Sequence, residues 1–424
     1  MKPIATLYSR VRERQVLLRA WRVIRSNAAR SGNRQSKREA DEFEENLPAN
    51  IENIQRRLKK GAYKFKAALG VAAPKGKGKA GKRAIVIAPV ADRVVQRAIL
   101  DTIYEHCPSG DMKAAVETAT SVGGVPGRGI GHALALIEKA EDDGARYAVR
   151  SDIRNFFPSF PRQEVMHYLR EQIHEPEFVD LFERAITVEL ANKAALGVDA
   201  ELFPLGEDGV AQGSPLSVLA GNIVLRHFDA ELNQRGIVCI RYIDDFLILA
   251  KNAKAATKAL AAARAILKPL RLEAYDPADA PEKAWAGTLN GGFDFLGYRV
   301  VRGLNPPSAS SRDKLLANIA GEIAEGKKWI SRVLRQDQPE TRRVQCYVQT
   351  LTQIDGILRG WSGAFQHSMS VQTFADLDTR IDVQLASFDK WFGEAVHQQT
   401  PNAYRRAMGI RLLGDAEAVP LPKV

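Results

Sequence analysis

The sequence predicts an α+β fold, because short apolar runs typical of buried strands alternate with segments whose apolar residues recur at helical spacing. The chain has 424 residues, enough for two or three domains, with 45% apolar and 26% charged residues, as is ordinary for a globular protein. After about residue 311 the pattern is almost wholly helical. We therefore expect a mixed N-terminal part, a helical C-terminal part and a boundary near residues 303–311.

The expected elements follow from these patterns in chain order. Helical spacing predicts helices over 6–30, 48–60, 92–106, 130–142 and 178–196, a helix starting near Pro161, a long helix after Pro215, and a helix over 253–268. Short apolar runs predict strands over 84–90, 146–153 and 293–300, and a hairpin over 238–250. Polar or Gly-rich stretches predict connections at 31–46, 71–83 and 121–131.

Positive charge is concentrated at the start of the chain. The formal net charge is +11, yet residues 1–100 hold 24 Lys and Arg against 8 Asp and Glu, a balance of +16, and the remainder carries −5. A basic first quarter on a slightly acidic remainder favours a polyanionic partner, above all nucleic acid.

Cysteine use and hydropathy indicate the compartment. The three cysteines, Cys107, Cys239 and Cys346, lie far apart without the CxxC spacing of a zinc site, which favours reduced thiols. No stretch approaches the roughly 20 apolar residues of a membrane span, and the first residues lack a signal-peptide core. We expect a cytoplasmic protein without a membrane partner.

Three aspartates stand where predicted strands end or turn. Asp152 ends the strand over 146–153, and Asp244 and Asp245 lie side by side inside the hairpin over 238–250. Paired strands can bring all three carboxylates to one edge of a sheet, where each raises the pKa of the others unless a cation neutralises them. Mg²⁺ suits such an all-oxygen site, and two ions there support phosphoryl transfer.

At this point the sequence resembles a known family. The segments "RSDIRNFFPSF", "GVAQGSPLSVLAGN", "YIDD", "EKAW" and "FDFLGY" follow the order of motifs in the palm of reverse transcriptases. Upstream, "KRAIVIAPVADRVVQRAI" and "SVGGVPGRG" are similar to segments of bacterial group II intron-type enzymes, and "LRGW" resembles their thumb. With its compact "QGSP" and without a clear endonuclease module, the sequence most resembles the stand-alone, defence-associated bacterial reverse transcriptases.

The resemblance implies a right-hand polymerase with fingers, a palm built on an antiparallel sheet, and a helical thumb. We expect an N-terminal extension and basic fingers at 1–145, the palm at 146–303, the thumb at 304–400 and a C-terminal tail at 401–424.

The resemblance also implies roles for individual residues. Asp152, Asp244 and Asp245 are the expected catalytic residues and, with the Ile153 carbonyl, the metal ligands. For nucleotide binding the expected residues are Arg83 on the triphosphate, Phe157 against the ribose 2′ position, Gln212 and Gly213 in the pocket, and Lys283 on the leaving pyrophosphate. For primer and template they are Tyr242, Lys75, Lys77, Lys79, Lys82 and Arg128. Either Phe156 or Phe157 is expected to be core.

The implied activity is RNA-directed DNA synthesis from dNTPs with two Mg²⁺, which Mn²⁺ could replace. The expected partners are an RNA template, in particular a cognate structured noncoding RNA, and the DNA product, and the expected biology is bacterial antiphage defence. Two alternatives stay open: an intron-type or retron-type enzyme whose main role is to bind structured RNA, and template-independent or protein-primed DNA synthesis. The sequence leaves oligomerisation open.

Overall fold

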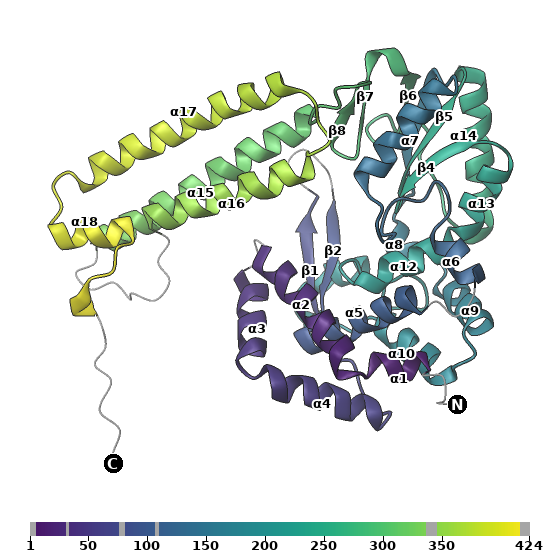
Figure 1. The fold of residues 1–424 in the computed structure, drawn as a ribbon, viewed down its shortest axis with the longest axis horizontal. Coiled ribbons are helices and arrows are strands. Elements are labelled where there is room, and N and C mark those ends of the chain that lie inside the picture. The colour runs from purple at the N-terminus through teal and green to yellow at the C-terminus, as the bar shows by residue number, and fades with distance from the viewer. Residues whose placement is uncertain (1–5, 31–33, 76–80, 107–109, 336–345, 416–424) are drawn as a thin grey trace. The chain divides into compact units, whose positions relative to one another are not determined.

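The computed structural model describes residues 6–30, 34–75, 81–106, 110–335 and 346–415 (Figure 1). By its internal contacts the chain divides into two compact units, Met1–Thr288 and Leu289–Val424. Each unit has its own hydrophobic core.

The first unit contains a four-stranded antiparallel sheet in the order β4–β5–β3–β6. Its strands are β3 Tyr147–Asp152, β4 Val238–Tyr242, β5 Asp245–Ala250 and β6 Trp285–Thr288. A separate hairpin pairs β1 Leu69–Pro74 with β2 Lys82–Ile87. The predicted strand over 146–153 and the predicted hairpin over 238–250 therefore form three of its four strands, with β3 and β5 at the centre.

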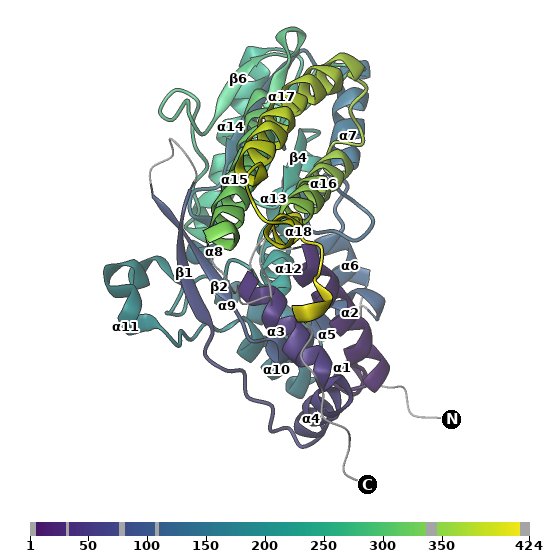
Figure 2. The ribbon, with the colours of Figure 1, turned by 90° about the vertical axis from the view of Figure 1, so that its left-hand side faces the viewer.

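Helices surround these strands. They are α1 Leu7–Val11, α2 Arg14–Arg30, α3 Arg34–Glu45, α4 Leu47–Lys59, α5 Val90–Glu105, α6 Gly110–Val116, α7 Ile130–Asp142, α8 Phe156–Ser159, α9 Arg162–Gln172, α10 Pro176–Ile186, α11 Lys193–Leu196, α12 Pro215–Val224, α13 Arg226–Gln234 and α14 Ala253–Leu267, with 3₁₀ turns η1 Gly197–Leu202 and η2 Lys268–Leu270. The helix α14 packs on β3 and β5, and Figure 2 shows α11 beside the β1–β2 hairpin.

Local chemistry sets where the helices near the sheet begin. The Ser214 hydroxyl accepts a hydrogen bond from the Leu216 amide, and Pro215 occupies the first turn of α12. The Asn252 side chain accepts from the Ala255 amide at the start of the Ala-rich α14. Both are standard N-caps, which satisfy amides that a helix leaves unpaired.

The second unit is mainly helical. It holds η3 Leu289–Gly291, β7 Phe293–Phe295, β8 Tyr298–Val300, α15 Ala309–Arg335, α16 Tyr347–Ala364, α17 Val371–Val396, α18 Pro401–Met408 and η4 Leu413–Asp415. The helix α15 packs against both α16 and α17 around a core that includes Ile319, Ile330 and Phe388.

Four expected elements differ from the structure. The long helix expected after Pro215 is divided at Leu225 into α12 and α13. Residues 31–46, expected as a connection, contain α3, which is anchored by the buried Ala40 and by Phe43 packed on Trp21 with ring centroids 4.8 Å apart. The helix expected over 178–196 ends at Ile186, because the chain then extends to bond with Ala68. The strand expected over 293–300 is a tight hairpin, since Leu296 and Gly297 both have positive φ.

The β7–β8 hairpin precedes the expected boundary at 303, yet it contacts the C-terminal helices. The Tyr298 hydroxyl donates to the Ala364 carbonyl, and the Tyr298 ring lies 4.9 Å from that of Phe365. These contacts place β7 and β8 with the C-terminal helices, so the division by contacts falls between Thr288 and Leu289.

Candidate active site

Neighbouring strands bring the three predicted catalytic aspartates together. Asp152, the last residue of β3, is the register partner of Asp245, the first residue of β5. Asp244 lies in the turn between β4 and β5, and its carbonyl accepts a hydrogen bond from the Ile153 amide at 3.1 Å. The sheet thereby gathers Asp152, Ile153, Asp244 and Asp245 at one edge.

The electrostatics of this edge favour a bound cation. Burial, followed by the charges of Asp152 and Asp245, raises the pKa of Asp244 to about 7. Burial also raises the pKa of Asp152, while Lys283, Lys75, Arg150 and Arg83 act in the opposite direction. In the part of the chain that the structure describes, the buried Oδ1 of Asp152 has no hydrogen-bond partner.

The oxygen atoms around Asp152 are of the kind that binds a divalent metal. Mg²⁺ prefers oxygen ligands, above all carboxylates. A buried carboxylate oxygen that no described group hydrogen-bonds, with two further carboxylates where the neighbouring strand begins, offers ligands of this kind. Among the described residues, no three His, Cys, Asp or Glu side chains already stand as a metal-binding group. The carboxylates fit Mg²⁺ in the chemistry of their oxygens, and the metal itself belongs to the proposal below.

The turn that carries Asp244 is strained. Ile243 has a φ of +64°, a left-handed conformation that costs a β-branched residue roughly 1–2 kcal/mol. A Cβ on Gly123 would lie 2.5 Å from the Ile243 amide nitrogen, so the Gly-rich segment approaches the turn as only glycine allows. The strain indicates that surrounding contacts hold this turn in place.

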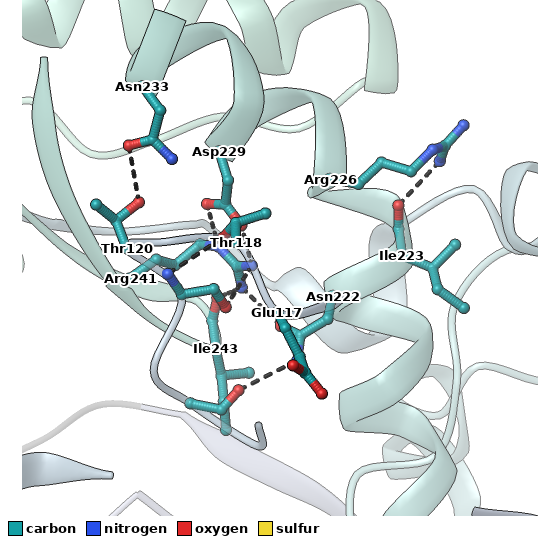
Figure 3. A network of polar contacts seen from close by, with 12 residues as sticks. Glu117, Thr118, Thr120, Asn222, Ile223, Arg226, Asp229, Asn233, Arg241 and Ile243 are labelled. Carbon is teal, nitrogen blue, oxygen red and sulfur yellow. Dashed lines mark hydrogen bonds and ion pairs between the residues drawn. The ribbon is translucent and has the colours of Figure 1, made fainter. Parts of the chain in front are cut away.

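A buried polar network lies beneath the same turn (Figure 3). The fully buried Arg241 guanidinium donates to both carboxylate oxygens of Asp229 and to Asn222 Oδ1, Ser121 Oγ and the Ile243 carbonyl. Sequence reasoning missed this network. The available signal was an arginine inside the apolar run of β4, a position where an unpaired charge is not tolerated.

The predicted nucleotide-binding residues lie on elements that touch one another. Phe156 is 2% exposed and belongs to the core, whereas Phe157 is half-buried, which resolves the ambiguity between them. The Phe157 carbonyl accepts from the Val210 amide at 2.8 Å. Two residues further on, the Gln212 carbonyl accepts from the Val86 amide of β2 at 2.9 Å, so one short segment links α8 to the strand that carries Arg83.

Close packing makes glycine necessary in this segment. Gly213 has a φ of +122°, and a Cβ there would lie 2.9 Å from the Val86 carbonyl oxygen. The sharp turn into α12 therefore depends on Gly213.

Lys283 lies next to the carboxylates. Its Nζ is 5.8 Å from the centre of the Tyr275 ring, and the Tyr275 amide donates to the Asp152 carbonyl at 3.2 Å. Lys283 is also the largest of the charges that oppose the raised pKa of Asp152. This position is compatible with the predicted contact to pyrophosphate.

The predicted primer and template residues divide into several groups. Tyr242 ends β4 opposite Asp245 and is half-buried. The charge of Lys75 acts on Asp152, so Lys75 lies on the side of the carboxylates. Lys82 forms an ion pair with Asp199 at 2.6 Å. Lys77 and Lys79 lie outside the described residues.

Arg128 holds the Gly-rich segment on which it lies. Its guanidinium donates to the backbone carbonyls of Glu117, Thr118 and Ser121. These bonds close the Gly-rich segment on itself, and the contact of the half-buried Arg128 with the template backbone stays a prediction.

The chain is similar in sequence to known proteins. Residues 73–300, more than half of the chain, match the family described as "Reverse transcriptase (RNA-dependent DNA polymerase)". Protein YkfC of Escherichia coli is 27% identical over 297 residues, covering 60% of this chain and 72% of that protein. The "Uncharacterized 91 kDa protein in cob intron" of Schizosaccharomyces pombe is 26% identical over 182 residues, covering 42% of this chain and 20% of that protein.

Solved structures are similar at lower identity. A chain of the "Partial Cas6-RT-Cas1--Cas2 complex" is 19% identical with a TM-score of 0.35, covering 63% of this chain and 43% of that one. Telomerase from Candida albicans is 11% identical with a TM-score of 0.39, covering 83% of this chain and 62% of that one. This chain therefore spans less than half of the first of these two chains.

The family match includes both strands that carry the carboxylates and the segment with Gln212 and Gly213. Within the described ranges, no helix has the length and apolar character needed to cross a bilayer. The chain belongs to the reverse transcriptase family of RNA-directed DNA polymerases, with the right-hand α+β fold of that family and a relative in bacteria.

Proposed function

We propose that this protein synthesises DNA on an RNA template at the edge formed by Asp152, Asp244 and Asp245. The observation that carries this proposal is the register pairing of Asp152 with Asp245, the residue next to Asp244. Among the described residues the buried Asp152 Oδ1 has no hydrogen-bond partner, and the charge of Asp152 helps to raise the pKa of Asp244. Asp152 and Asp244 are the principal metal ligands in this proposal, with Asp245 and the Ile153 carbonyl as further ligands.

Two bound Mg²⁺ would supply activation of the primer hydroxyl and stabilisation of the leaving oxygen. The chain's own residues align the substrates, which is the larger part of phosphoryl-transfer catalysis. Arg83 binds the triphosphate, Phe157 excludes a ribose 2′-hydroxyl, and Lys283 neutralises the leaving pyrophosphate. Gln212 and Gly213 line the pocket, and Tyr242 supports the primer end.

We further propose that the template is a cognate structured noncoding RNA and that the enzyme serves in bacterial antiphage defence. The basic first hundred residues, with a balance of +16, support a large polyanionic partner. In this proposal residues 1–145 are the fingers, 146–303 the palm and 304–400 the thumb. Lys77 and Lys79, with Lys75 and Lys82, add to the basic surface of the fingers.

Primer extension on an RNA template tests the catalytic proposal. We expect wild-type protein to incorporate dNTPs, and the Asp244→Asn and Asp245→Asn variants to lose at least about 1,000-fold in rate, because each removes a negative ligand. Asp279→Asn, at an exposed aspartate of the same unit, is the matched control and should keep wild-type activity. Equal incorporation by the site variants would exclude this site.

An intron-type role in RNA binding is the second candidate. One relative is named for its place in the cob intron, although the match covers 20% of that protein. Sequencing the RNA that copurifies with the protein separates the two. Intron RNA domains would favour the second candidate, and a noncoding RNA encoded beside defence genes would favour the first.

A further inference from the structure

We propose that Arg241 and Asp229 are positioning residues that hold the turn bearing Asp244 and Asp245 in its catalytic shape. The proposal rests on the proposed function of that turn and adds two residues that lie outside the sequence motifs quoted above. We call Arg241, Asp229, Asn222 and Ser121, together with the Ile243 carbonyl, the Arg241 network (Figure 3).

All five N–H donors of the Arg241 guanidinium are used. Nε and one Nη2 donor bind the two carboxylate oxygens of Asp229, and the other Nη2 donor binds Ser121 Oγ at 2.9 Å. The two Nη1 donors bind Asn222 Oδ1 and the Ile243 carbonyl, both at 2.9 Å. Arginine supplies five donors in one rigid plane, so lysine cannot replace it here.

The ion pair is wholly removed from solvent. Both side chains are 0% exposed, and Asp229 also accepts from the Thr118 hydroxyl at 3.1 Å. Such a pair is poor evidence for stability in itself, because the cost of desolvation offsets much of the attraction. It does fix geometry, since each partner has one arrangement that satisfies all of its bonds.

The network acts on the peptide groups that flank Asp244. The carbonyl of Ile243, immediately before Asp244, is held by Arg241, and the carbonyl of Asp244 itself is held by the Ile153 amide of the neighbouring strand. The backbone on both sides of the catalytic carboxylate is therefore anchored. Loss of the Arg241 bond frees the first peptide group to rotate and lets Ile243 leave its left-handed conformation.

The Gly-rich segment closes the arrangement from the other side. The Arg241 amide donates to the Thr120 carbonyl, the Val122 amide donates to the Arg241 carbonyl, and Asn222 Nδ2 donates to the Gly123 carbonyl at 3.2 Å. The network thus joins β4, α12, α13 and the 118–123 segment at one point, directly below the turn.

Three variants and one control test the proposal. Arg241→Lys keeps the charge opposite Asp229 and removes the planar set of donors. Asp229→Asn keeps the shape and removes the charge. The double variant Arg241→Met with Asp229→Leu removes both charges and fills the space, an exchange that buried ion pairs generally tolerate. Glu231→Gln, which breaks the exposed pair with Arg235 on the same helix, is the matched control.

We expect kcat for dNTP incorporation to fall about 10- to 100-fold in all three variants, with the KM for dNTP and the Kd for primer–template changed less than about 3-fold. A second readout needs no activity. Mg²⁺ alone, without nucleotide or RNA, should raise the Tm of the protein. The Mg²⁺ concentration that gives half of the maximal rise should be about 10-fold higher in the variants. It should be unchanged in Glu231→Gln.

A purely structural network predicts a different result. The Tm would fall in the variants, while kcat well below that Tm and the Mg²⁺ dependence would stay at wild-type values in Arg241→Lys and in the double variant. That outcome would overturn the proposal. If wild-type protein incorporates no dNTP, the proposed function fails instead, and the Mg²⁺ titration still decides whether the network sets the metal-binding geometry.

Discussion

Asp244 links the chemistry of the site to the pH dependence of folding. Its pKa is raised to about 7, so folding favours the protonated form. That contribution to stability is fully present below the ordinary pKa near 4 and is lost as the pH rises through about 7. In metal-free buffer with EDTA, Asp244→Asn should therefore be more stable than wild type, by a margin that grows between pH 4 and 7 and then stays constant.

The expected margin in Tm at pH 8 is roughly 2–8 °C, for a few kcal/mol in a chain of this size. Thermal unfolding at a series of pH values measures it, with Asp279→Asn as the control at an exposed position. Parallel curves for wild type and Asp244→Asn would show that folding does not raise the pKa of Asp244.

Phe157 provides a second prediction for a single residue. Phe157→Val should narrow the preference for dNTPs over rNTPs by about 10- to 100-fold, because a smaller side chain leaves room for the 2′-hydroxyl. The ratio of kcat/KM for dGTP and rGTP measures this. Phe156→Leu changes a ring that packs on α12, where a Cβ on Gly221 would lie 2.8 Å from it, and should lower the Tm without altering the ratio.

At the scale of elements, activity should depend on the close packing of the 118–123 segment against the β4–β5 turn. Gly123→Ala would place a methyl group 2.5 Å from the Ile243 amide nitrogen, and backbone cannot move aside as a flexible side chain can. We expect a loss of about 1–3 kcal/mol in the free energy of unfolding and at least a 10-fold fall in kcat. Chemical denaturation and primer extension measure the two effects.

Gly129→Ala is the control for that prediction. Gly129 lies in the same Gly-rich stretch, and nothing stands within 4 Å of a Cβ added there. Wild-type stability and activity are therefore expected. A loss that is equal in both variants would point to the flexibility of the stretch and away from its contact with the turn.

The elements that sequence predicted well are those whose pattern is local. The strand ending at Asp152, the hairpin around Asp244 and the Ala-rich α14 are confirmed, because apolar runs and caps lie within each segment. The helix α3 was missed because partners distant in sequence stabilise it: Glu39 pairs with Arg93, and Arg25 pairs with Asp41. The β7–β8 hairpin was missed because Leu296 takes a positive φ that its residue type does not announce.

The same distinction applies to the site. The aspartates could be predicted because they stand in a recognisable motif beside short strands. Arg241 could not be assigned, since its partners Ser121, Asn222 and Asp229 come from three separate segments whose convergence depends on the completed fold.

For the whole molecule, we expect RNA binding to depend more on where the positive charges lie than on the net charge. Some basic residues of the first hundred are already paired with carboxylates, among them Arg19 with Glu105 at 2.8 Å. Lys59 and Lys60, in the exposed end of α4, have no acidic partner within 4 Å among the described residues. Residues of this second kind are the ones that can exchange counterions for RNA phosphates.

RNA binding should therefore weaken steeply with salt, and the slope should depend on which lysines are changed. We expect Lys59→Gln with Lys60→Gln to reduce the slope of log Kd against log salt concentration by roughly 1.4–1.8, if each lysine neutralises one phosphate. Arg19→Gln should leave the slope unchanged, because its guanidinium is already neutralised by Glu105. Filter binding of a structured RNA between 50 and 300 mM salt, about the range in which such slopes are resolved, measures both. A slope that falls equally in the two variants would mean that net charge steers the RNA, and a slope that falls in neither would move the RNA-binding surface away from α4.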